Sequence, residues 1–144
     1  MKIYYHYTNR EGYEGILATG VIRPSLKSSQ RDANFGDGVY LTTITPAEIA
    51  NSDRASVQRL AILVPRGSAN ELFGFAAEED RIGYFFKLSL SEDEVTNFSD
   101  LISELGIDPA TLQPRDIRRV YLYKTSSDFE IGSSSHGETR LQNS

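Results

Sequence analysis

Cysteine is absent from this chain of 144 residues, and histidine occurs only twice. Without cysteine there can be no disulfide framework, no thiolate zinc site and no cysteine nucleophile. Two histidines are too few for a histidine-rich metal site, so we expect no bound metal. A chain of this length can bury a sufficient core without disulfides or metal.

Long apolar runs and an excess of positive charge are also lacking. No stretch approaches the length of a membrane span, and the first residues do not include the apolar segment of a secretory signal. The formal charge of −5 argues against a broad electrostatic surface for nucleic acid, although Arg115, Arg118 and Arg119 form a local basic cluster. We therefore expect no membrane partner and a cytoplasmic site of action, in the producing cell or a target cell.

The composition that remains, 39% hydrophobic and 24% charged residues, is that of an ordinary globular protein. No internal repeat or linker divides the chain. We expect one domain over residues 1–132, followed by a polar, frayed C-terminal tail over residues 133–144.

The order of the expected elements predicts an α+β fold. Strands are expected at residues 3–7, 21–24, 39–42, 83–90, 120–123 and 129–131, and residues 60–64 read as strand or buried helix. Capping boxes at residues 8–11 and 45–48 predict two helices, the first ending at Gly20, and residues 99–106 read as a third helix. Helices inserted early among short strands favour α+β over a regular βαβ sheet. The glycines form neither a Rossmann nor a P-loop motif.

The first strand carries a histidine between tyrosines. Side-chain alternation places Tyr5 and Tyr7 on one face of this strand, and Tyr4, His6 and Thr8 on the other. A single histidine in such a position is more often structural than functional, so its role depends on what surrounds it.

Three segments stand in order along the chain: "YHYT", then "GDGVYLT", then "DFEI". Together they resemble the His-Tyr-Asp class of ADP-ribosyltransferase toxin domains, which are related to diphtheria toxin and the poly(ADP-ribose) polymerases. The resemblance covers residues 4–46, extends to "YFFKLSL", and continues in order through "RRVYLYKTSSDFEIG". It implies an ADP-ribosyltransferase-like fold, with a split, antiparallel-rich β-sheet core and short helices in a single domain.

The same resemblance implies an activity. The family consumes NAD and breaks the bond between nicotinamide and ribose, which requires stabilisation of an oxocarbenium-like centre. An aromatic face can hold the cationic pyridinium ring, and a carboxylate can offset the developing charge. The resemblance therefore implies a mono-ADP-ribosyltransferase of the toxin or effector type, with NAD as a consumed substrate.

Residue roles follow from the match of the motifs. His6 matches the family histidine that hydrogen-bonds the ribose on the adenosine side of NAD, and Thr8 shares its strand face. Tyr7 matches the position whose main chain fixes the nicotinamide amide, its side chain being expected in the core. Tyr40 matches the tyrosine that stacks on nicotinamide.

Two further residues are candidates for the phosphates of NAD. Arg23 and Ser25 stand in "IRPS", and an arginine fork matches phosphate geometry, although a plain surface role for the arginine is equally open.

The catalytic carboxylate has three candidates. Glu130 matches the place of the catalytic acid, although the His-Tyr-Asp class carries an aspartate there. Asp128 lies two residues earlier on the same strand face, and Asp116 is expected to be an ordinary solvated charge. The sequence leaves open whether Glu130 or Asp128 does the chemistry.

Several functions and partners also stay open. The alternatives are an NAD glycohydrolase, an RNA 2′-phosphotransferase-like enzyme, and an inactive module that binds NAD or protein. The acceptor would be a protein or a nucleic acid, selected by the loops at residues 25–38 and 65–80. A toxin domain would also be expected to have an antitoxin or immunity partner.

Overall fold

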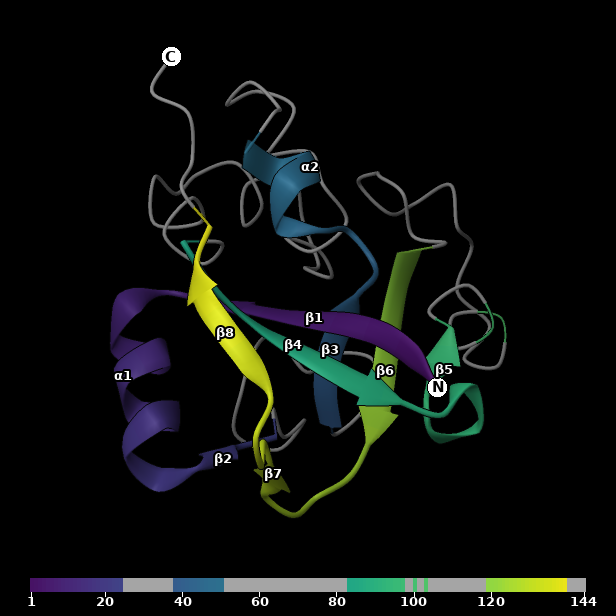
Figure 1. Cartoon of the computed structure of the whole chain (residues 1–144). Helices are drawn as coiled ribbons and strands as arrows, with labels where there is room; N and C mark the ends of the chain where they lie inside the picture. The colour runs from purple at the N-terminus through teal and green to yellow at the C-terminus, as the bar shows by residue number, and fades with distance from the viewer. Residues whose placement is uncertain (25–37, 51–82, 98–99, 101–102, 104–118, 140–144) are drawn as a thin grey trace, which may run out of the picture.

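A computed structural model describes residues 1–24, 38–50, 83–97, 100, 103 and 119–139. Six strands form one sheet in the order β5-β6-β3-β1-β4-β8, and β2 pairs with β7 in a separate two-stranded sheet (Figure 1). All the strand pairings are antiparallel. The large sheet comprises β1 (Lys2–Thr8), β3 (Gly38–Thr42), β4 (Tyr84–Leu90), β5 (Thr96–Asn97), β6 (Val120–Lys124) and β8 (Ser135–Glu138). The small sheet comprises β2 (Val21–Ile22) and β7 (Phe129–Glu130).

The helices are short. Two α-helices lie wholly within the described residues, α1 (Arg10–Thr19) and α2 (Pro46–Ala50), and a 3₁₀-helix, η3, spans Glu92–Glu94. None of the helices in the described residues is long and apolar enough to cross a membrane. This antiparallel architecture with few helices is the α+β arrangement that the sequence predicted.

Helix α1 begins one residue later than its capping box predicted. Strand β1 continues through Thr8, so the extended Asn9 becomes the N-cap, and its side chain accepts a hydrogen bond of 2.8 Å from the Gly12 N–H. The helix ends as predicted at Gly20, which has a φ of 76° and donates its N–H to the Ile16 carbonyl. These two caps fix where the chain leaves β1 and where it enters β2.

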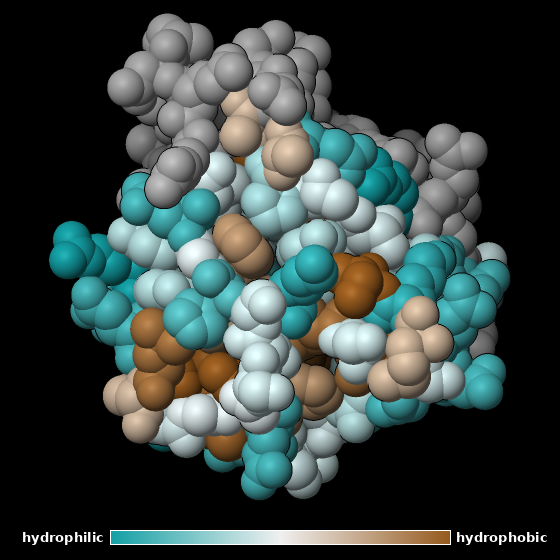
Figure 2. Space-filling view, in the orientation of Figure 1, coloured by the Kyte–Doolittle hydropathy of each residue, from teal (hydrophilic) through white to brown (hydrophobic). Residues whose placement is uncertain are grey.

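The two faces of the large sheet bury different residues. The main core lies on the face toward α1, β2 and β7, and includes Tyr4, Ile16, Ile22, Val39, Leu41, Phe86, Leu88 and Leu90. Other buried residues lie outside this cluster, among them Ile44, Ile49 and Leu122. On the outside, Figure 2 shows small, separate hydrophobic patches among hydrophilic side chains. Of the large hydrophobic residues described, Met1, Ile3 and Leu17 are exposed.

Strand β8 was not predicted. Residues 135–138 were expected to lie in a frayed tail, but they pair with β4 from Tyr84↔Glu138 to Lys87↔Ser135. The segment lacks an apolar alternation, so its order comes from the main-chain ladder and from the contact between the His136 and Phe86 rings, 5.6 Å apart. The short elements β5 and η3 were also not predicted. The expected elements at residues 60–64 and most of residues 99–106 lie outside the described residues.

An arginine joins α2 to the end of β6. The Arg119 guanidinium donates to both carboxylate oxygens of Glu48, at 2.7 and 2.8 Å, and to the Thr43 carbonyl at 2.8 Å. Glu48 also closes the predicted capping box, accepting from the Thr45 N–H at 2.7 Å. These hydrogen bonds, first of all those from Arg119, lower the pKa of the Glu48 carboxyl to about 2. Arg119 is thus committed to an intramolecular contact, and the other two arginines of its cluster lie outside the described residues.

Candidate functional site

A pocket of about 420 Å³ lies between β1, α1 and the start of β2. Strand β1 contributes His6 and Thr8 to its lining, and α1 contributes Gly12, Gly15 and Thr19 among others. The two residues of β2 and the exposed Arg23 close the described part of the wall. The described lining therefore comes from one continuous stretch of chain, folded back on itself by the Asn9 and Gly20 caps.

His6 is half-buried on the face of β1 that meets α1, and it pairs with Phe86 across the ladder to β4. Its Nδ1 lies 3.2 Å from the main-chain carbonyl oxygen of Tyr40. Because a carbonyl oxygen can only accept, this hydrogen bond requires the proton to be on Nδ1. In a neutral imidazole the other ring nitrogen, Nε2, is then an acceptor, which suits a ligand hydroxyl.

Tyr40 meets His6 through its main chain. In β3, Tyr40 lies opposite Leu122 of β6, and Thr42 lies opposite Tyr5 of β1. Alternation along β3 therefore places the Tyr40 ring on the sheet face of Tyr5, whereas His6 points to the other face. The structure brings His6 and the Tyr40 carbonyl together, but the Tyr40 ring is not among the described residues that line the pocket.

The Tyr7 side chain has a structural role. Its hydroxyl donates a hydrogen bond of 2.7 Å to the Ile44 carbonyl, which ties β1 to the segment before α2. Burial raises the pKa of the Tyr7 hydroxyl well above its ordinary value, and the nearby Tyr5 adds to the effect. The Tyr7 side chain is therefore a neutral hydrogen-bond donor, in line with its expected place in the interior.

Of the candidate carboxylates, Glu130 lies beside the pocket wall. Glu130 is exposed and lies directly opposite Val21 in the β2–β7 ladder. The ladder continues by one hydrogen bond, which the Ile131 N–H donates to the Gly20 carbonyl at 3.0 Å. Side chains of directly opposed residues share a face, with Cβ atoms roughly 5 Å apart. Because Val21 lines the pocket, Glu130 stands next to its wall.

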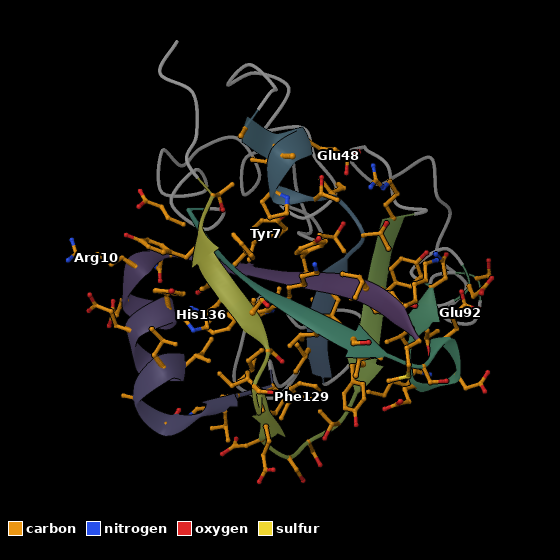
Figure 3. All side chains as sticks on the ribbon, viewed as in Figure 1. Tyr7, Arg10, Glu48, Glu92, Phe129 and His136 are labelled. Atoms are coloured by element: carbon orange, nitrogen blue, oxygen red, sulfur yellow. The ribbon has the colours of Figure 1, made fainter. Side chains whose placement is uncertain are left out.

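Asp128 is exposed and precedes β7, outside the ladder. Phe129, between Asp128 and Glu130, packs inward, with its ring centroid 5.1 Å from that of Tyr123. Figure 3 shows Phe129 at the end of the molecule where β7 lies. Asp116 and Ser25 lie outside the described residues.

A cluster of aromatic rings around Tyr13 fixes α1 on the sheet. The Tyr13 ring stacks on Tyr84 at 4.6 Å, and its hydroxyl lies 2.6 Å from Nδ1 of His136. Figure 3 shows His136 on β8 beside α1. This cluster holds the helical wall of the pocket in place.

Sequence reasoning missed the helical side of the pocket. Gly12, Gly15 and Thr19 follow one another at intervals of three and four residues, the spacing that places side chains on one face of a helix. That run of small residues, directly after the histidine motif, was the signal that could have located the wall. Among the described residues no group of three or more His, Asp or Glu side chains is arranged to hold a metal ion.

Comparison with known proteins bears on the same part of the chain. Residues 4–100 match the model of a family described as an ADP-ribosyltransferase containing the HYD1 signature. No curated protein and no solved structure matches. The matched segment includes His6, Tyr40 and the whole described lining of the pocket, and it stops before Asp128 and Glu130. Since it spans well over half of the chain, this protein belongs to the ADP-ribosyltransferase toxin family with the HYD1 signature.

Proposed function

We propose that this protein is a mono-ADP-ribosyltransferase that cleaves NAD in the pocket between β1, α1 and β2. The observation that carries the proposal is His6, which lies in the family-matched segment and lines a pocket of about 420 Å³ with Arg23. That volume is within the range of ligand sites and suits part of a dinucleotide. The product, ADP-ribose, would pass to a protein or a nucleic acid.

Polar residues of the pocket and two neighbouring tyrosines have separate roles in this proposal. His6 accepts a hydrogen bond from a ribose hydroxyl at Nε2, Thr8 lies beside it, and Arg23 offsets the charge of the phosphates. The main chain of Tyr7 fixes the nicotinamide amide. Tyr40 orients His6 through its carbonyl oxygen, since alternation along β3 places its ring on the other face of the sheet from the pocket.

Glu130 supplies the negative charge in the proposed reaction. The bond from the ribose C1′ to the nicotinamide nitrogen breaks, and its electron pair leaves with nicotinamide, which becomes neutral. The ribose is left as an oxocarbenium ion, which the carboxylate stabilises. A nucleophile of the acceptor then bonds to C1′ and gives up its proton. In this scheme the six-stranded sheet and the β2–β7 pair are the two parts of a split sheet beside the NAD site.

The proposal is tested with NAD labelled in its adenylate half. The purified protein is incubated with this NAD and a cell lysate, with Glu130→Gln as the matched control. Label on protein or on nucleic acid supports a transferase and identifies the class of acceptor. Release of nicotinamide without transfer would instead identify an NAD glycohydrolase, and no turnover by the parent protein would favour a binding module.

We further propose that the protein acts in the cytoplasm, where NAD is available, and that an antitoxin or immunity protein neutralises it. Co-expression with candidate partners, followed by the same labelling assay, tests the second point.

A further inference from the structure

Helix α1 carries two glycines in its ten residues, and only one is explained by packing. A Cβ atom at Gly12 would overlap the Thr8 hydroxyl, so glycine there gives room to the Thr8 side chain where β1 passes into α1. A Cβ atom at Gly15 would have no atom within 4 Å, and the residue has no positive φ. Glycine inside a helix is less stable than alanine, so Gly15 needs another reason.

That reason lies in where Gly15 is placed. Gly15 is exposed and lines the pocket on the same helical face as Gly12 and Thr19, whereas Ile16, which also lines the pocket, is buried in the core. A side chain at position 15 would therefore project into the pocket without meeting other protein atoms. Across the pocket from this helical face are His6 and the residues of β2.

We infer that Gly15 sets the width of the pocket, and that the bound nucleotide packs directly against the main chain of α1 at this residue. The inference rests on the proposed function, because it takes NAD as the ligand. Gly15 is then a determinant of specificity, since its missing side chain gives room to a sugar or base that any larger residue would displace.

The test compares Gly15→Ala and Gly15→Leu with the parent protein. Thermal unfolding measures stability, calorimetric titration measures NAD affinity, and nicotinamide release gives KM and kcat. We expect Gly15→Ala to raise Tm by roughly 2–4 °C, because alanine favours the helix. We expect Gly15→Leu to stay folded and to lose about tenfold or more in NAD affinity, with the loss in KM rather than in kcat.

Ala18→Leu is the matched control. Ala18 is exposed on the same helix and is not among the described residues of the pocket lining, so a leucine side chain there should leave NAD binding unchanged. Two results would overturn the inference while the proposed function stands: unchanged NAD affinity in Gly15→Leu, or a lower Tm in Gly15→Ala, which would make Gly15 a packing residue. Failure of the parent to bind NAD would overturn both.

Discussion

At the scale of single residues, His6 is defined by the hydrogen bond from Nδ1 to the Tyr40 carbonyl. We expect nitrogen-15 spectra of the ligand-free protein to show that Nδ1 of His6 carries a proton, because the carbonyl can only accept. His6→Gln would assign the signals, since His136 is the other histidine of the chain. A dominant Nε2–H form would contradict the contact, whatever the ligand proves to be.

The carboxylates give a second prediction at this scale. Glu130→Gln removes charge at nearly constant shape, so we expect nearly unchanged NAD affinity and a loss of turnover of roughly a hundredfold or more. Asp128→Asn should do much less, because Asp128 lies outside the ladder that holds Glu130 opposite Val21.

NAD titration and nicotinamide release, measured on both purified variants, decide between the two acids. The reverse ranking would transfer the catalytic role to Asp128.

At the scale of elements, α2 is held to Arg119, the residue before β6, by the contact of that arginine with Glu48. The pKa of Glu48 is lowered from 4.5 to about 2 in the folded protein, so its contribution is complete above pH 4.5 and disappears as pH falls toward 2. We expect Glu48→Gln to reduce the free energy of unfolding at pH 7 by roughly 1 kcal/mol, since the side chain is 45% exposed and solvent screens the pair.

Urea unfolding of parent and variant at pH 7 and near pH 2 measures this difference, which should shrink at the lower pH. Glu14→Gln is the control, because Glu14 pairs with Arg10 within α1, where both side chains are more than 60% exposed. A difference that persists at low pH would assign the effect to something other than the charge of Glu48.

The elements also show why prediction from sequence worked in some places and failed in others. Strands β1, β3 and β4 and the end of α1 were predicted because their signals are local: alternating side chains, turn glycines and a left-handed cap at Gly20. Strand β8 has no such signal, since its partner β4 lies far away in sequence. The face on which Tyr40 lies depends on the register between β3 and β1, which only the folded sheet defines.

At the scale of the whole molecule, the candidate site was predicted in part. The histidine motif was found because its residue types by themselves indicate hydrogen bonding to a ligand, and the family match covers it. The glycine-lined wall was missed because glycine has no side chain, and the sequence search was for polar side chains that could contact a ligand. The roles of the carboxylates and of the Tyr40 ring stay predictions.

The pairing of β2 with β7 also sets an order of events during synthesis. Ribosomes make proteins from the N-terminus, so residues 6–23 emerge long before Phe129 and Glu130, the partners of β2. A nascent chain therefore carries the histidine motif while one wall of the pocket lacks its neighbouring strand and the candidate acid has not yet been made. For a toxin-family protein, the consequence is a delay during translation. The candidate site, with Glu130 beside its wall, is complete only after nearly all of the described chain has been made.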